Sequence, residues 1–342
     1  MNGYYCGLDV SNKSTAVCVV NASGRVVKQL QTSTTERGLR EGLKEYKGLR
    51  CVVEAGPLAE SICNFVEKVG HKIEILDPRR AKAVTSGKRK TDKLDAEKLA
   101  QVCRTGWYTR VHRKSGKARG LRSYLTARMQ MVKTAGALAS TIRGIFRAHG
   151  IIIAVGKDGK FEANVLQALK KAEPMLHAAI TPLLKAWKGA NLCEKQMYRT
   201  LNRQVARQSQ EIRNLMTVPG VGPATAAAFV ATIDTPKRFA SSEQVGDYFG
   251  LVPSLYQSGE VEIRGRITKH GDELMRFLLV EAATTILSRC KKNFALRQWG
   301  LKLQEKKDFG KARVAVARKL ACLLHHLWIT GKPFDASRAV AA

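Results

Sequence analysis

The first hundred residues alternate between short apolar segments and amphipathic segments, and this order limits the folds open to the chain. Turn formers separate runs of β-branched and aromatic residues, which predicts strands over 4–10, 14–20, 24–32, 49–55 and 71–77. Apolar residues at helical spacing predict helices over 36–46, 57–70 and 92–105. The order is therefore strand, strand, strand, helix, strand, helix, strand, helix, which indicates an α/β domain.

The ribonuclease H-like fold has this order of elements, and its first and fourth strands are neighbours. Asp9 lies inside the first predicted strand and Glu54 ends the fourth, so we expect the two carboxylates to lie side by side. Asp92 and Asp95 are three residues apart on one face of the helix over 92–105, which Thr91 can cap and Gly106 can end. A carboxylate buried in a strand is costly unless it is paired or metal-bound.

Four carboxylates that meet in space repel one another unless cations lie between them. Their oxygen ligands suit Mg²⁺, for which Mn²⁺ can substitute, and paired ions assist phosphodiester chemistry. Each acid also has an ordinary interpretation, since aspartates form turns and Asp92 would be stabilised by the dipole of its helix. The set of four on these elements favours a metal site formed by Asp9, Glu54, Asp92 and Asp95.

The charge of the chain indicates a polyanionic partner. Fifty-nine Lys and Arg against 28 Asp and Glu leave a net charge of +31. From Lys98 to Lys157 there are thirteen Lys or Arg and no acid, yet apolar residues recur there at helical spacing. We therefore expect an ordered basic helix that contacts nucleic acid through Arg119 and Arg122. Phosphates beside the acids would be held by Lys88, Arg89, Lys90 and Lys93.

The rest of the chain predicts a mostly helical structure. Residues 119–216 are helical except for a break at 156–161, and the polar segment 192–216 suits an extended hairpin or coiled coil, with one helix of a bundle as the alternative. Residues 237–272 are turn-rich with short strands, and helices over 273–290 and 311–331 close the chain. We divide the chain into an α/β domain (1–118), basic helices with a coiled-coil segment (119–216) and a C-terminal domain (217–342).

Several classes of protein are disfavoured. No apolar run is long enough to span a membrane, and the first ten residues lack the layout of a signal peptide. The eight cysteines occur singly, which predicts reduced thiols and no structural zinc site. These features favour a cytoplasmic protein associated with the nucleoid and not with a membrane.

The segment VPGVGPATAAAF (218–229) places a Pro-Gly-Val-Gly turn between two helices. This pattern is typical of a helix-hairpin-helix, in which Gly220 and Gly222 let backbone N–H groups approach a DNA phosphate. A tight helical connection without a ligand is the alternative.

These segments together resemble the DEDD transposases of bacterial insertion sequences, the family of the Piv invertase and the bridge-RNA-guided recombinases. The resemblance rests on GLDV, VVEAG, KTDKLDAEKLA, VPGVGPATAAAF, FGLVPSLYQSGEVEIRGRITKHGD and GKPFDASR, which occur in the family's order along essentially the whole chain. One departure is KHGDELMRF, where Asp272 stands in place of the neutral residue that relatives often carry.

The resemblance implies a RuvC-like N-terminal domain with the four acids as metal ligands and a C-terminal transposase domain with Ser258 as nucleophile. It also implies donor and target DNA, an element-encoded noncoding guide RNA, a phosphoserine intermediate and a homo-oligomer, a dimer or a tetramer. From the residues alone, Ser258 looks like a turn serine, although Arg264, Arg266, Lys269 and His270 could surround a phosphate.

Two other functions stay open. A RuvC-like endonuclease or Holliday junction resolvase would use metal-activated water and form no covalent link. A basic architectural protein with a decayed nuclease domain would need none of the acids, and the presence of all four disfavours it.

Overall fold

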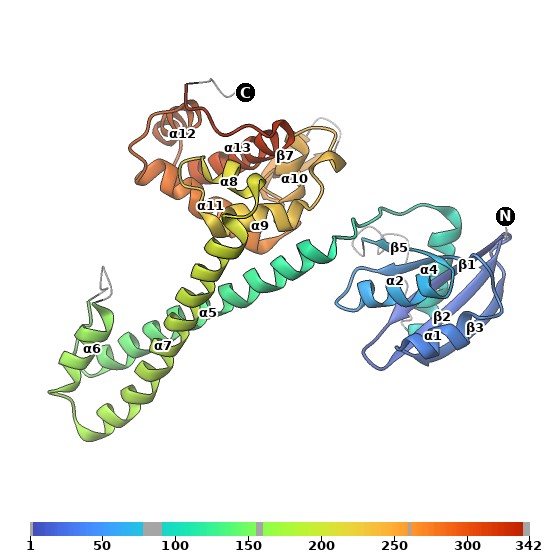
Figure 1. The fold of residues 1–342 in the computed structure, drawn as a ribbon, viewed down its shortest axis with the longest axis horizontal. Helices are drawn as coiled ribbons and strands as arrows, with labels where there is room; N and C mark the ends of the chain where they lie inside the picture. Colours follow the sequence, from blue (N-terminus) through green and yellow to red (C-terminus); the bar gives the residue numbers. More distant parts are fainter. Residues whose placement is uncertain (1–2, 78–90, 155–159, 259–260, 338–342) are drawn as a thin grey trace. The chain divides into compact units, whose positions relative to one another are not determined.

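The computed structural model describes residues 3–77, 91–154, 160–258 and 261–337. Contacts divide the chain into two compact units, Met1–Lys114 and Ser115–Ala342, each of which has its own core. The first unit is a mixed α/β sheet and the second is mostly helical (Figure 1). The predicted division into three domains remains a prediction, because the basic helices and the C-terminal domain fall together in the second unit.

The first unit is built on one five-stranded sheet. Its strands have the order β3-β2-β1-β4-β5, with β2 antiparallel to β1 and β3, and with β4 and β5 parallel to β1. The bounds of the strands are β1 Tyr4–Val10, β2 Ser14–Asn21, β3 Val26–Ser33, β4 Arg50–Glu54 and β5 Lys72–Leu76. The order of elements matches the sequence prediction, and β1 and β4 are neighbours, as predicted.

Helices cover both faces of this sheet. Helices α1 (Glu36–Leu43) and α2 (Ala59–Lys68) enclose one apolar layer with the sheet, which includes Leu8 and Val53. Helix α4 (Asp92–Thr105) packs on the other face. Thr91 caps α4 by accepting the N–H of Leu94, and Gly106 ends it in the left-handed conformation, so both predicted ends of this helix are confirmed.

The second unit begins with an antiparallel helical arm. Helix α5 (Gly116–Ala148) runs along α7 (Pro174–Thr200), and side chains of the short helix α6 (Phe161–Leu169) share an apolar cluster with both at the far end (Figure 1). At the near end, the Tyr124 hydroxyl donates to the Met197 carbonyl, and Arg128 pairs with Glu194. Of the segment 192–216, for which the sequence predicts an extended hairpin or coiled coil, only residues 192–200 belong to this arm, at the end of α7.

The predicted long helix over 192–216 is interrupted. Helix α7 gives way to a π-helical turn over Leu201–Ala206, and α8 (Gln210–Met216) starts afresh after it. Ser209 begins α8 because its hydroxyl accepts the N–H of Ile212 at 3.2 Å. The side chain of Ser209 thus competes with helix continuation, and a continuous coiled coil over 192–216 is not what forms.

The remainder of the second unit is a helical body with one hairpin. Its elements are α9 (Pro223–Ile233), a 3₁₀ turn (Pro236–Arg238), α10 (Glu243–Tyr248), β6 (Pro253–Ser258), β7 (Val261–Ile267), α11 (Glu273–Ser288), α12 (Ala295–Lys306) and α13 (Phe309–Thr330). Apolar side chains from α8, α9, α11 and α13 form its core, and Leu125 of α5 joins them.

Two smaller predictions are also settled. None of the described helices combines the length and apolar character needed to cross a bilayer. All eight cysteines are free thiols, as the sequence predicts.

Candidate active site

Asp9 and Glu54 lie side by side at one edge of the sheet. Strands β1 and β4 are parallel, and their register aligns Leu8 with Val53. The next residue on each strand is the acid, so both carboxylates stand where the strands end, and both are half-buried. On its other side Asp9 is aligned with Ala16 of β2. The predicted juxtaposition of the two acids is confirmed at the level of the strands.

Helix α4 crosses β1 in direct contact with Gly7. A Cβ atom at this position would lie 2.2 Å from the carbonyl oxygen of Ala96 and 2.3 Å from the nitrogen of Ala100. Side chains alternate along a strand, so Asp9 projects on the same face as this contact. Glycine is therefore required at position 7, because any side chain would push α4 off the face that carries Asp9.

The first turn of α4 points toward the end of β1. Near the C-terminus of α4, Gln101 and Arg104 donate to the carbonyls of Gly24 and Ala22, in the turn beside the start of β1. Helix α4 therefore runs antiparallel to β1, and its N-terminal turn, which carries Asp92 and Asp95, lies toward the edge where Asp9 stands.

The surface between α4 and the sheet is apolar and buried. Ala16 and Cys18 of β2 pack there against Ala96 and Ala100. Burial, with a smaller effect of the Glu97 carboxylate, raises the pKa of the Cys18 thiol to about 12. Charged groups are therefore disfavoured between α4 and the sheet. The sheet face covered by α4 becomes accessible to water at the edge that carries Asp9 and Glu54.

The four acids occupy one end of one sheet face but do not form a closed set of ligands. Asp92 is exposed, and Asp95 is half-buried with an ion pair to Lys98 at 3.4 Å. Within the described ranges, no three His, Cys, Asp or Glu side chains lie close enough together to hold a metal ion. The donor set fits a hard divalent cation such as Mg²⁺ in chemistry, but its side chains would have to move together to bind one.

Of the four basic residues predicted beside these acids, the structure describes one. Lys88, Arg89 and Lys90 lie outside the described residues. Lys93 is exposed in the first turn of α4, where its carbonyl accepts a hydrogen bond from Gln29 of β3 at 2.9 Å.

Ser258 ends strand β6 of the exposed hairpin in the second unit, where it is aligned with Val261 of β7. The side chains of Ser258 and Arg264 lie outside the described part of the structure. Arg266, Lys269 and His270 are described: Arg266 and His270 are exposed, and Lys269 is exposed with a left-handed φ of 54°. Tyr256 and Ile263 are aligned across the hairpin, and their side chains are 65% and 56% exposed.

Asp272 has a structural role that the sequence did not reveal. Its carboxylate accepts the N–H of Met275 at 2.7 Å, which caps helix α11, and also pairs with the guanidinium of Arg122 on α5. Arg122 donates a further hydrogen bond to the hydroxyl of Thr232 at 3.2 Å. The charge of Arg122 is thus engaged within the protein, and its predicted contact with nucleic acid stays a prediction. Arg119 is half-buried one turn earlier on α5.

The Pro-Gly-Val-Gly turn joins α8 to α9, as predicted, but its two glycines differ. Gly220 has a φ of +86°, and a Cβ there would meet the Ala282 carbonyl of α11 at 2.9 Å. Gly222 precedes α9 with an ordinary φ of −93°, and a Cβ there would meet nothing within 4 Å. The fold explains Gly220 but leaves Gly222 unexplained.

Two family models match the chain in separate regions. A DEDD transposase model of the IS110 type matches residues 6–151, which include all four acids. The model of the transposase IS116/IS110/IS902 family matches residues 212–298, which include the α8–α9 turn and the β6–β7 hairpin.

Two curated relatives cover nearly the whole chain. The chain is 26% identical over 329 residues to a probable family 20 transposase of Pseudomonas aeruginosa, and the alignment covers 95% of this chain and 96% of that protein. It is also 26% identical over 332 residues to the transposase for insertion sequence element IS1111A of Coxiella burnetii, with 93% and 87% covered. A third relative is the transposase for insertion sequence element IS1328 of Yersinia enterocolitica, 23% identical over 243 residues, with 70% of this chain and 72% of that protein covered.

Proposed function

Because the chain belongs to the DEDD transposase family of bacterial insertion sequences, whose members cleave and rejoin DNA, we propose that it acts as an RNA-guided recombinase for its element. The observation that carries this proposal is the edge of the sheet where Asp9, next to the last residue of β1, and Glu54, the last residue of β4, stand on neighbouring strands, with the first turn of α4 toward the same edge. The strand order β3-β2-β1-β4-β5 supports a RuvC-like assignment for this unit.

Asp9, Glu54, Asp92 and Asp95 would hold Mg²⁺, or Mn²⁺ in its place. A bound divalent ion supplies charge that polarises a phosphodiester and neutralises the oxygen anion that leaves it. Asp9 and Glu54 are positioned by a rigid sheet, whereas Asp92 is exposed on the first turn of α4. We expect DNA and metal to draw Asp92 and Asp95 toward the other two acids, because oxygen ligands and a divalent cation relieve the repulsion among four carboxylates.

Ser258 would act as the nucleophile. Its Oγ forms a bond to phosphorus as one phosphorus–oxygen bond to a sugar breaks, and its hydroxyl proton passes to a base while the sugar oxygen leaves. The reverse step, in which a sugar hydroxyl of the partner strand attacks the phosphoserine, releases Ser258 and completes the exchange. The exposure of Tyr256 and Ile263 on the same hairpin supports a nucleophile that works against a partner surface.

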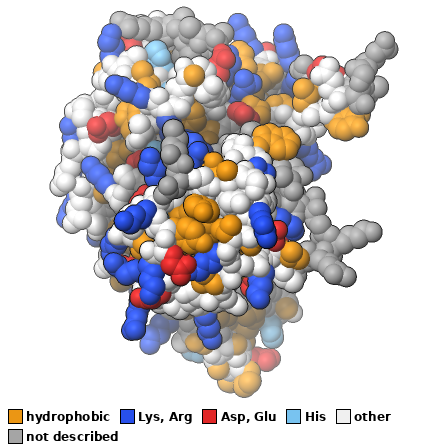
Figure 2. All heavy atoms as spheres, turned by 90° about the vertical axis from the view of Figure 1, so that its right-hand side faces the viewer, with side chains coloured by type: hydrophobic (Ala, Val, Ile, Leu, Met, Phe, Trp, Pro, Cys, Tyr) orange, Lys and Arg blue, Asp and Glu red, His pale blue; other side chains and the backbone are white. Residues whose placement is uncertain are grey.

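The partners proposed are donor and target DNA together with an element-encoded noncoding RNA that guides their choice. The net charge of +31 supports binding to large polyanions such as DNA and RNA. Figure 2 shows Lys and Arg side chains spread over the face that it draws, with fewer Asp and Glu among them. We propose a homo-oligomer, a dimer or a tetramer, in which the serine of one subunit meets the acids of another.

Three variants test the chemistry in a strand-exchange assay between two plasmids with Mg²⁺ present. We expect Asp9→Asn and Asp92→Asn to lose exchange by a factor on the order of 10³, since a bound metal contributes several kcal/mol. Ser258→Ala should lose exchange and also the covalent protein–DNA adduct seen on a denaturing gel. The matched controls are Asp247→Asn, on the exposed surface of α10, and Ser254→Ala, four residues earlier on β6.

The outcomes separate the functions. A fully active Ser258→Ala protein would remove the serine from the mechanism, and DNA cleavage without an adduct would indicate a RuvC-like endonuclease. Near-normal turnover by Asp9→Asn would remove that residue from the metal site. For the guide, nucleic acid that co-purifies from the native host should contain one discrete noncoding RNA, and heterogeneous fragments alone would contradict RNA guidance.

A further inference from the structure

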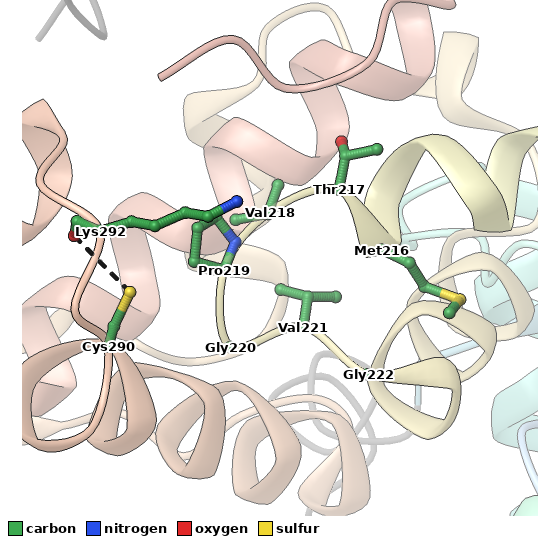
Figure 3. Close-up of a pocket in the computed structure, with 9 residues that line it drawn as sticks. All are labelled: Met216, Thr217, Val218, Pro219, Gly220, Val221, Gly222, Cys290 and Lys292. Atoms are coloured by element: carbon green, nitrogen blue, oxygen red, sulfur yellow. Dashed lines mark hydrogen bonds between the residues drawn. The ribbon is translucent and has the colours of Figure 1, made fainter. Parts of the chain in front are cut away.

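A hollow of about 520 Å³ lies between the α8–α9 turn and the loop that follows α11. One wall is the run Met216–Gly222, and the opposite wall is formed by Cys290 and Lys292 (Figure 3). Figure 3 draws the Lys292 side chain reaching toward Pro219 from the opposite wall. The loop is held in shape partly by the Cys290 thiol, which donates to the Lys292 carbonyl at 3.6 Å.

The charge at this hollow is positive and uncompensated. Within the described part of the chain, no carboxylate pairs with Lys292, and Arg289 and Lys291 beside it are exposed. Residues 282–334 carry twelve Lys or Arg against Glu305 and Asp308. This second basic region is separate in sequence from the acid-free stretch 98–157.

The turn on the other wall leaves space that the protein does not fill. Gly220 is required by its left-handed φ and by its approach to α11, whereas Gly222 faces open space and could carry a Cβ without a clash. Glycine at an N-cap position offers no side-chain cap, and Ser, Thr, Asp or Asn would serve the fold better there. A surface that must approach the backbone closely would account for Gly222.

The residues that line the hollow indicate which class of ligand fits it. None of the nine lining residues is aromatic, so a base has no ring to stack on there. A lysine and exposed backbone are groups that contact the sugar–phosphate backbone of a duplex without reading its sequence. The Thr217 hydroxyl is engaged within the protein, because it donates to the Asn214 carbonyl and accepts the Phe334 N–H.

We propose that this hollow binds a phosphodiester of duplex DNA, with Lys292 as its cation and the Met216–Gly222 turn as the surface against which the strand lies. The inference rests on the proposed function, because it assumes that duplex DNA is a substrate. It adds the Arg289–Lys292 loop to the DNA-binding surface, and it assigns the two glycines of the turn to different tasks.

The test is the salt dependence of binding to a fluorescent DNA duplex of random sequence. Lys292→Gln should lower the slope of log K against log salt by about 1 and weaken binding roughly eightfold at about 0.1 M salt, equally for unrelated sequences. Lys72→Gln, the same change of charge at an exposed lysine where β5 begins, should alter neither quantity. Gly222→Ala should weaken binding while its urea unfolding midpoint stays at the wild-type value.

Cys290 provides a second readout, since its half-buried thiol lines the hollow. Saturating duplex should slow its alkylation by iodoacetamide in the wild type, less so in Lys292→Gln, while the exposed Cys193 on α7 measures general shielding. Unchanged Cys290 alkylation, an unchanged slope for Lys292→Gln, or protection by a hairpin RNA but not by duplex DNA would each overturn the proposal. A wild-type protein that fails to bind duplex at all would instead overturn the proposed function.

Discussion

The acids and the serine proposed for strand exchange stand on two very different supports. Asp9 and Glu54 lie near the ends of inner strands of a five-stranded sheet with helices on both faces, and their neighbours Leu8 and Val53 are completely or almost completely buried. Ser258 ends a strand of a two-stranded hairpin whose Tyr256 and Ile263 are mostly exposed.

The two supports suit two different tasks, because the sheet can position metal ligands and the hairpin can dock on a partner surface. A metal site tolerates little displacement of its ligands, and a packed sheet fixes two of the four before substrate arrives. A two-stranded hairpin is marginally stable by itself, so its geometry depends on its base and on whatever it meets. The sheet of the first unit therefore serves as a rigid platform for Asp9 and Glu54. The hairpin of the second unit carries Ser258, and we expect contact with a partner surface to fix its geometry. Three changes test this division.

Gly7→Ala should have the largest effect on stability, and it should be confined to the first unit. The added methyl group would overlap backbone atoms of α4, so the helix must shift, at a cost of about 3 kcal/mol or more. Amide hydrogen exchange of β1 and α4 measures the loss locally, with no change expected in the second unit. Gly120→Ala is the control, because a Cβ there meets nothing within 4 Å and alanine should stabilise α5 by about 0.5–1 kcal/mol. Normal protection of β1 in Gly7→Ala would show that the platform is not rigid.

Local patterns predicted much of the first unit. The strands of the sheet were evident because β-branched and aromatic runs lie between turn formers, and the ends of α4 were evident from Thr91 and Gly106. The contact of Gly7 with α4 was not predictable in this way, because it joins positions about ninety residues apart that no local pattern relates. The ion pair between Arg122 and Asp272 was not predictable for the same reason.

The active site was predictable only as far as the strands determine it. The neighbouring positions of Asp9 and Glu54 follow from the order of elements, so they could be derived. How closely Asp92 and Asp95 approach them depends on side-chain conformations and on a bound ion, which a sequence pattern does not encode. The Lys292 loop was not predictable as a binding site, because its basic residues lie beside segments whose helical periodicity already accounts for them.

Asp272→Ala tests how the base of the hairpin is held, and its effect should be intermediate. The change removes both the cap of α11 and the ion pair with Arg122, and we expect a loss of about 2 kcal/mol from the second unit. Asp272→Asn keeps an oxygen that can accept the Met275 N–H and should lose less, which separates the cap from the charge. Urea unfolding measures both variants. Equal losses for alanine and asparagine would assign the whole effect to the ion pair.

Tyr256→Ser should have the smallest effect, and it sharpens the comparison most directly. The ring is 65% exposed, so the free energy of unfolding should change by no more than about 0.5 kcal/mol, although the aligned Ile263 also loses its cross-strand neighbour. Leu8→Ala, at a completely buried position on β1, should cost about 2–5 kcal/mol in the same urea experiment. A loss above about 2 kcal/mol for Tyr256→Ser would mean that the hairpin is supported within its own subunit, and the division between a rigid platform and a docking hairpin would then fail.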